Sequence, residues 1–416
     1  MERFQSLLGI PILVLIAWGL LSTDRKSFPW RTVVWGIVLQ PGFGMLILWT
    51  PWGRVAFEWL GGIVTRFLGF SQAGAEFLFG NIVNEKYHDT FGFQFAFAIL
   101  PTIIFVGASM TILYHLGIMQ RVVRAVAWVM SKTMGTSGAE SLSCAANIFV
   151  GQTEAPLVVA PFLRTLTRSE LMAVMAGGFA SIAGGVMAGY IMLGIPAKHL
   201  LAAAVMSAPA ALVFAKIMVP ERDKPLTAGQ VQMPEMERHT NLLDATAAGT
   251  RDGLKLAVNV GAMLLAFIAL IAALNAGLNW VHWKLFHLGF MYFPASLRDI
   301  FSVVFSPVAF VVGVPWKEAG HFGYLIGTQI SINEFVAYIQ LSEMIKSGVI
   351  SERTITLASY ALCAFANFSS IGIQIGGISG LVPERRAELA QLGLRAMLCG
   401  NLASLQTATI AGMLVS

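Results

Sequence analysis

The chain has 416 residues, of which 56% are hydrophobic and only 12% are charged, and its mean hydropathy is +0.72. A soluble domain is about 25% charged, so this composition excludes an ordinary water-soluble protein and predicts one embedded in a bilayer. The net charge of +5 comes from lysines and arginines beside apolar stretches. It therefore indicates membrane orientation and not nucleic-acid binding.

Membrane-spanning helices need about 20 largely apolar residues each. The first apolar run is followed by the basic pair Arg25 and Lys26, and no small-residue cleavage site comes after it. We therefore expect a retained helix with its N-terminus outside, and not a cleaved leader. Residues 53–70 carry charges between apolar residues at helical spacing, which predicts a helix lying in the membrane interface. Eight spans are predicted, over residues 6–22, 32–50, 91–119, 170–193, 200–219, 254–276, 355–378 and 389–414.

Positive charge sets the expected topology. With the N-terminus outside, most of the 27 basic residues fall on the cytoplasmic side, as the positive-inside rule requires. Both termini are then expected on the periplasmic face of a bacterial inner membrane. The polar stretch 220–253 becomes a cytoplasmic connector.

Two apolar regions, 122–166 and 298–346, are each broken by polar residues, around Gln152 and around Asn333. Non-helical backbone survives at membrane depth only inside protein or along a watery cavity, so both regions are predicted to be re-entrant helical hairpins. Each is followed by a span that small and polar residues interrupt, at 180–185 and 365–370. The expected topology makes the two hairpins enter from opposite sides. Such an inverted repeat points to the binding site of a transporter.

Glu154 and Glu334 stand at the two hairpin breaks. A carboxylate in the membrane costs about 2.5–3.5 kcal/mol and usually faces a functional cavity, although capping of a broken helix is the alternative. Uncharged polar residues beside them suit a neutral, hydroxyl-rich solute with an amide-like ring. Contacts between helices, worth about 0.6 kcal/mol each, are the alternative for any one of these residues. The residues are Asn147, Gln152, Thr153, Asn333, Asn367, Ser369 and Ser370.

Broken helices also expose backbone carbonyls, which are suitable ligands for a small monovalent cation. Asn147 and Ser181, with the carbonyls of Val150 and Ile182, are the candidates. The sequence has no histidine pair at metal-ligand spacing, no Gly-x-Ser-x-Gly motif and no phosphate-binding loop, so no enzyme activity and no cofactor are predicted.

Three stretches resemble the motifs of the concentrative nucleoside transporter family. They are GQTEAP at 151–156, NEFVAY at 333–338 and FANFSSI at 365–371, and GVPW at 313–316 adds to the likeness. The resemblance extends over nearly the whole chain. It implies a homotrimer in which each protomer has its own pathway, and a transport domain that moves across the bilayer like an elevator.

The resemblance also implies roles for individual residues. Gln152, Thr153, Glu154 and Val186 would face the nucleobase, and Glu334, Phe365, Asn367 and Ser370 would surround the ribose of a nucleoside such as uridine. Sodium, the coupling ion, would be bound by Asn147, Val150, Ser181 and Ile182. Proton-coupled members tend to lack the asparagine found here at 147, so its presence favours sodium coupling.

The sequence therefore predicts an all-α polytopic membrane protein with about eight transmembrane helices, an interfacial helix and two re-entrant hairpins in an inverted repeat. The predicted function is sodium-coupled nucleoside import, with proton coupling or a channel for small polar solutes as alternatives. The expected domains are 1–119, largely scaffold; 120–219, transport domain; 220–253, connector; 254–297, scaffold; and 298–416, transport domain.

Overall fold

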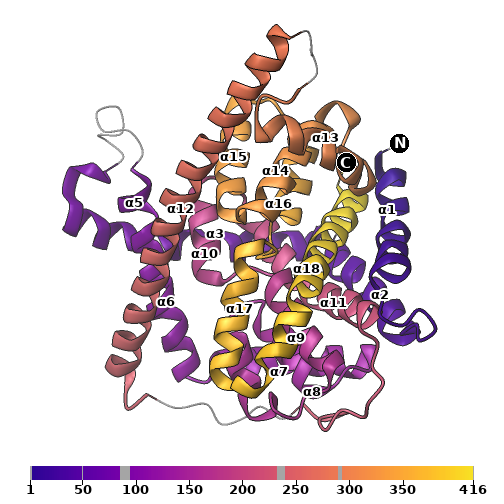
Figure 1. Ribbon diagram of the computed structural model, residues 1–416. Helices are drawn as coiled ribbons and strands as arrows, with labels where there is room; N and C mark the ends of the chain where they lie inside the picture. The colour runs from indigo at the N-terminus through magenta and orange to yellow at the C-terminus, as the bar shows by residue number, and fades with distance from the viewer. Residues whose placement is uncertain (1, 49, 85–93, 232–238, 289–292, 416) are drawn as a thin grey trace.

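A computed structural model of the chain describes residues 2–48, 50–84, 94–231, 239–288 and 293–415. Within these ranges the protein is built from helices, without a β-strand (Figure 1). Helices suit a chain in lipid, because a helix satisfies its own backbone hydrogen bonds where no water is available. The predicted all-α class is confirmed.

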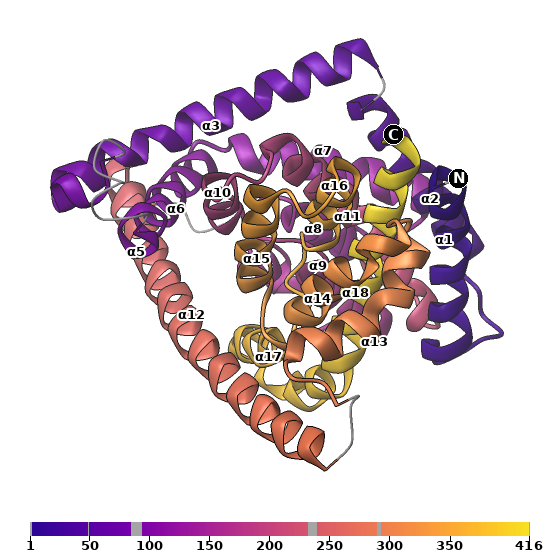
Figure 2. The ribbon, with the colours of Figure 1, turned by 90° about the horizontal axis from the view of Figure 1, so that it is seen from above.

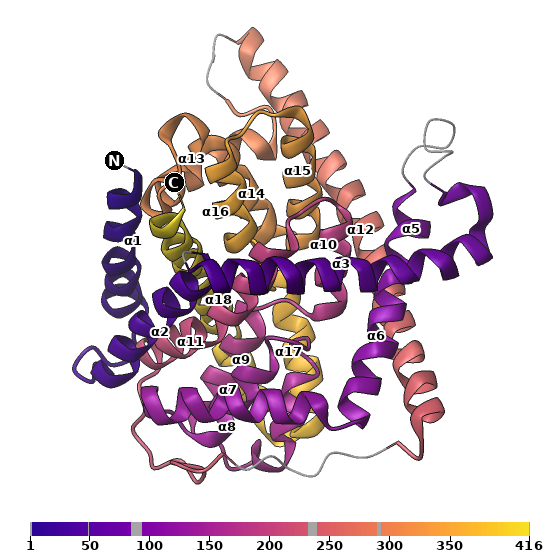
Figure 3. The ribbon, with the colours of Figure 1, turned by 180° about the vertical axis from the view of Figure 1, so that it is seen from behind.

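The N-terminal part contains two apolar helices and one that lies across the others. The chain turns by 73° between α2 and α3, where Thr50 caps α3 and Pro51 occupies its first turn. Figure 3 shows α3 transverse to most of the other helices. It is longer than the expected 53–70 segment. The elements are α1 (Glu2–Ile16), a π-helical turn (Ala17–Leu21), α2 (Trp30–Leu48), α3 (Pro51–Phe79) and a 3-10 turn (Gly80–Ile82).

A first set of elements follows, and its helices are interrupted where the sequence is rich in glycine and proline. The segment that contains Pro156 and Pro161 forms a 3-10 helix and not an α-helix, because each proline lacks the backbone N–H that an α-helix would use. The elements are α5 (Phe95–Ala98), α6 (Leu100–His115), α7 (Ile118–Met134), α8 (Gly138–Ala146), a 3-10 helix (Ala155–Phe162), α9 (Arg168–Ala180), α10 (Gly184–Met192) and α11 (Ala197–Met218).

A second set begins with the long helix α12, and its pairs α14–α15 and α16–α17 follow in the same chain order as α8 with its 3-10 helix and α9–α10 in the first set. In Figure 1, α8 lies at the lower end of the molecule and α14 lies in its upper half. The elements are α12 (Leu242–His287), α13 (Leu297–Val312), a 3-10 turn (Trp316–Glu318), α14 (Ala319–Ser331), α15 (Glu334–Ser347), α16 (Glu352–Ala361), α17 (Phe368–Leu381), a 3-10 turn (Pro383–Arg385) and α18 (Arg386–Leu414).

The structure corrects several expected boundaries. Among the described residues, five helices are long and apolar enough to cross a membrane, or six if α2 and α3 count as one span. The count falls below eight partly because the span expected at 355–378 is divided between α16 and α17. The span expected at 254–276 is only part of the 46-residue α12, whose start at Leu242 also shortens the connector. Parts of the predictions for 32–50, 91–119 and 220–253 lie outside the described residues.

The helices pack as two bodies that meet chiefly where α10 packs on α6. The main neighbour of α12 is α6, whereas α9, α11, α16, α17 and α18 pack on one another. Figure 2 shows α3 and α12 running along two sides of this larger group. The helices α1 and α2 pack on α18 and α11.

A buried ion cluster fixes the first turns of α8 and α9 against α11. The Lys216 ammonium lies 2.6 Å from Glu140 and 3.1 Å from Glu221, and Lys216 and Glu140 are almost fully buried. Ser137 and Thr167 form capping boxes with Glu140 and Glu170, and the Ser137 hydroxyl also donates to Glu170. Both helices therefore start from one hydrogen-bonded cluster.

We expect Lys216→Met to destabilise the protein by about 3–5 kcal/mol, because it leaves buried carboxylates without a counter-charge. Lys198 on the same helix is a matched control, since its pair with Glu58 is solvent-exposed at 3.9 Å. Lys198→Met should cost about 0–1 kcal/mol. The melting temperatures of the purified variants measure both effects, and equal values for the two would contradict the assigned role of Lys216.

Candidate functional site

The two interrupted spans touch each other at their interruptions. α9 ends at Ala180 and α10 begins at Gly184, while α16 ends at Ala361 and α17 begins at Phe368. The Phe365 amide donates to the Ser181 carbonyl at 3.2 Å, and the Gly184 amide donates to the carbonyl of Phe149 at 3.1 Å. Polar backbone groups freed by each break are thus partly satisfied by the other segments. The contacts bring both expected motif regions to one place.

Glu334 occupies the first position of α15 and is buried. The side chain of the preceding Asn333 caps this helix by accepting from Val336. The Glu334 carboxylate accepts from the Asn367 side-chain amide at 2.9 Å and from the Tyr190 hydroxyl at 3.2 Å. The partial positive charge at the start of α15 also favours an anion there.

Asn367 caps α17 and connects Glu334 to Gln152, which lies in the turn between α8 and the following 3-10 helix. Its side-chain oxygen accepts from the Ser370 amide at 2.9 Å and from the Ser369 hydroxyl at 2.7 Å. The Gln152 amide in turn donates to the Ser370 hydroxyl at 3.1 Å. A continuous polar chain therefore runs from Glu334 through Asn367 and Ser370 to Gln152.

The other residues expected at the solute site surround this chain less closely. Thr153 is half-buried and its methyl group lies where a Cβ on Gly377 would make close contact. Val186 is buried in the first turn of α10, and Phe365 is half-buried at the break before α17. Glu154 is exposed, and the chain of hydrogen bonds from Glu334 to Gln152 does not include it.

The segments that carry the four residues expected at the cation site contact each other, since α8 packs on α9 and the Gly184 amide donates to the Phe149 carbonyl. Asn147 directly follows α8, and its amide nitrogen donates to the Ser143 carbonyl at 3.0 Å. Ser181 directly follows α9, is buried, and has a hydroxyl without a hydrogen-bond partner in the described structure. Gly177 lets α8 approach, because a Cβ there would lie 3.2 Å from the Asn147 amide. The ends of α8 and α9 carry partial negative charge, which favours a cation.

Two buried residues were missed by the sequence reasoning. Tyr190 donates to Glu334 and stacks on Tyr338 with 4.1 Å between ring centroids. Gln374 of α17 donates to the Met175 carbonyl of α9, and its side-chain oxygen has no partner among the described residues. The only feature of the sequence that could have identified these two residues is that each places a polar group within an apolar helix.

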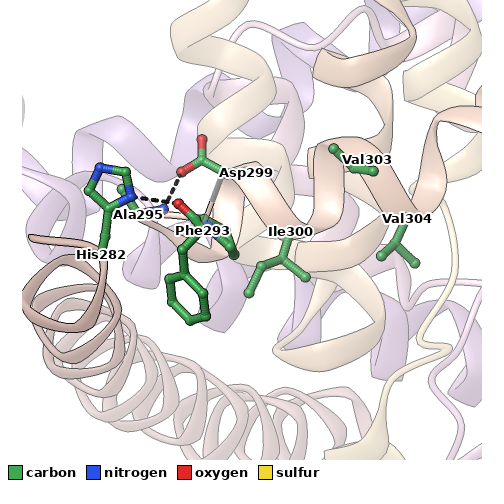
Figure 4. Close-up of a pocket in the computed structure, with 8 residues that line it drawn as sticks. His282, Phe293, Ala295, Asp299, Ile300, Val303 and Val304 are labelled. Atoms are coloured by element: carbon green, nitrogen blue, oxygen red, sulfur yellow. Dashed lines mark hydrogen bonds between the residues drawn. The ribbon is translucent and has the colours of Figure 1, made fainter. Parts of the chain in front are cut away.

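A cavity of about 500 Å³ lies elsewhere, between the end of α12 and the start of α13. Figure 4 shows that its walls are largely apolar, with His282 and Asp299 at one side. It contains none of the expected site residues.

Comparison with known proteins gave consistent matches along the chain. Residues 8–82 and 199–412 match the N-terminal and C-terminal regions of the Na+ dependent nucleoside transporter family. Residues 96–197 match the family described as "Nucleoside recognition".

Individual relatives match over nearly the whole chain. The uncharacterized transporter YutK of Bacillus subtilis is 45% identical over 100% of both chains. Sodium/nucleoside cotransporter 1 of Rattus norvegicus is 41% identical over 99% of this chain and 64% of its own length. A solved structure of CNTnw in an inward-facing substrate-bound state has a TM-score of 0.92 and 43% identity, covering 100% of this chain and 98% of that one.

The Tyr190–Glu334 contact gives a direct test of the polar chain. Tyr190→Phe removes a hydrogen bond to a buried carboxylate, and we expect a loss of about 1.5–3 kcal/mol in stability. Tyr360→Phe is the control, because the Tyr360 hydroxyl is buried without a hydrogen-bond partner in the described structure. Thermal unfolding should separate the two variants, and an equally small loss in both would show that the contact contributes little.

Proposed function

The chain belongs to the concentrative nucleoside transporter family, and on this basis we propose that it imports nucleosides together with sodium by an elevator-type movement. Its relatives are transporters and not enzymes, and its apolar helices make it a multi-pass membrane protein. The polar chain from Glu334 to Gln152 carries the proposal. It joins the two expected hairpin tips to the break before α17, and Tyr190 of α10 donates to its Glu334 end.

The polar chain offers groups that match a nucleoside. An ionised Glu334 is acceptor-only and can take two ribose hydroxyl hydrogens, while Asn367 and Ser370 can both donate and accept. The Gln152 side-chain oxygen is buried without a partner in the described structure, which suits a donor on a nucleobase. We propose that Glu334, Phe365, Asn367 and Ser370 surround the sugar, and that Gln152, Thr153 and Val186 face the base. Glu154 joins the base side only if its exposed side chain turns inward.

We propose that Asn147, Ser181 and the carbonyls of Val150 and Ile182 bind the coupled sodium ion. The Asn147 nitrogen is already used by Ser143, so its oxygen is the end that can face a cation. The family description names sodium, which favours it over the proton-coupled alternative. A channel is the weaker alternative, because the polar residues cluster at the breaks and do not line a continuous path.

The two packing bodies support a division into a scaffold and a moving domain. We propose that α6 and α12 form the scaffold and that the hairpin regions with α9–α11 and α16–α18 move. The assignment of α1 and α2 to the scaffold stays a prediction, because these helices pack on the other body. A homotrimer in the bacterial inner membrane, with both termini periplasmic, is part of the same proposal.

Uptake should depend on sodium. One charge crossing about 100 mV supplies roughly 2.3 kcal/mol, and a tenfold sodium gradient adds about 1.4, which together support roughly 500-fold accumulation. Asn147→Ala and Ser181→Ala should each raise the sodium concentration for half-maximal uridine uptake roughly tenfold or more. Ser207→Ala is the matched control, since Ser207 is equally buried but bonds within its own helix. Uptake that ignores sodium and follows a proton gradient would contradict the proposal.

Glu334 should select the sugar. Glu334→Gln keeps the shape but loses charge-assisted bonds worth about 1.5–3 kcal/mol, so we expect at least a roughly tenfold loss of uridine affinity. Glu343→Gln, an exposed position on the same helix, should bind normally. Equilibrium binding of uridine and its 2′,3′-dideoxy analogue measures the effect. A folded Glu334→Gln variant that retains the wild-type preference for uridine would remove Glu334 from the sugar site.

A further inference from the structure

The second half of the molecule contains a counterpart of the proposed cation site. In the first half, the ends of α8 and α9 meet where α9 is interrupted. In the second half, α14 ends at Ser331 and α16 ends at Ala361, again where a span is interrupted. These two helices contact each other. Each end directs partial negative charge and free carbonyls toward the break, which is the environment that attracts a cation.

At the break between α16 and α17, a side-chain amide already donates hydrogen bonds to the free carbonyls. Gln329 lies in the last turn of α14 and is completely buried. Its side-chain amide donates to the Leu362 carbonyl at 3.3 Å and to the Ala364 carbonyl at 3.0 Å. Only the nitrogen end of the amide can face two carbonyl oxygens, because the oxygen end would repel them. The amide hydrogens therefore supply the positive partial charge that a cation would supply.

The first half differs at the same point. The Ser181 hydroxyl is buried without a partner in the described structure, and the Asn147 amide nitrogen is turned to the carbonyl of its own helix. Among the described residues, no long side chain bridges α8 to the carbonyls of the first break as Gln329 bridges α14 to those of the second. The Ser181 hydroxyl oxygen thus remains available at the first break, although the Ser181 carbonyl already accepts from the Phe365 amide.

We infer that Gln329 replaces a second cation in the pseudo-symmetric half, so that one sodium ion is coupled to each nucleoside. This inference rests on the proposed sodium site at Asn147 and Ser181. Gln329 thereby sets the coupling stoichiometry without touching solute or sodium.

The stoichiometry follows from the reversal potential of uridine flux in proteoliposomes of the purified wild type. We expect one sodium ion per uridine, and a ratio of two would overturn the inference. A wild type whose uridine flux and thermal stability do not respond to sodium would instead refute the proposed function, so the two failures are distinguishable.

The role of Gln329 is tested in a variant whose proposed sodium site at Asn147 and Ser181 no longer binds sodium. In an Asn147→Ala background we expect the melting temperature to be the same in sodium chloride and choline chloride. Adding Gln329→Ala frees the Ala364 carbonyl and leaves the Leu362 carbonyl only its bond from the Ala364 amide, and sodium should then raise the melting temperature by about 2 °C or more over choline. Adding Gln374→Ala, another buried amide that donates to a carbonyl, should give no such rise.

The response of each purified variant to sodium either supports the inference or overturns it. A Gln329→Ala double variant that folds in sodium but not in choline supports the inference, because sodium then replaces the amide. A variant that folds in both salts and gains nothing from sodium overturns it. If Gln329→Ala folds in neither salt, Gln329→Ser replaces it, since a hydroxyl keeps an oxygen ligand there, and an absence of sodium stabilisation in that variant overturns the inference as well.

Discussion

A backbone group that loses its helix partner inside an apolar environment must find another, and this constraint organises the protein. The interruptions after Ala180 and Ala361 each free amides and carbonyls. They are placed against each other, so that the Phe365 amide meets the Ser181 carbonyl. Asn333 and Asn367 cap the helices that restart beyond the breaks. The polar residues that serve this need are the same ones that form the candidate site, because the apolar surroundings leave no other place for them.

The direction of the helices separates two kinds of chemistry. α15 and α17 begin at the centre, and their positive ends face Glu334 and the capping asparagines. α8 and α9 end there, and their negative ends face Asn147 and Ser181. The direction of the helix dipoles alone therefore separates two places: the helix starts, which suit the hydroxyl-accepting groups, and the helix ends, which suit the ligands of a cation. The Lys216 cluster contributes by fixing the far ends of α8 and α9 in common register.

The sequence predicted the polar breaks well because polar residues in apolar runs are conspicuous. Glu334, Asn367 and Gln152 lie together, as expected. Tyr190 was missed because a tyrosine in an apolar helix is usually packing, and only its contact with Glu334 reveals its role. In the sequence, Glu154 was as good a candidate for the solute site as Glu334, yet its side chain is exposed. The sequence pattern indicates that a residue lies in a membrane-embedded segment but not which way its side chain points. The extent of α12 was also missed, because its first turns are polar and its last turns mix aromatic residues with His282, Lys284 and His287, so that neither end resembles an apolar span.

The length of α12 has a geometric consequence. Its 46 residues span about 69 Å, at about 1.5 Å per residue, while the hydrocarbon core is about 30 Å thick. Tilts of up to about 40° cannot absorb such an excess, so the helix must emerge into water, in keeping with Arg251 and Asp252 near its start and Lys284 near its end. For the movement proposed above, α12 is therefore long enough to keep its contact with a neighbouring helix that shifts along it by a distance comparable to the membrane thickness.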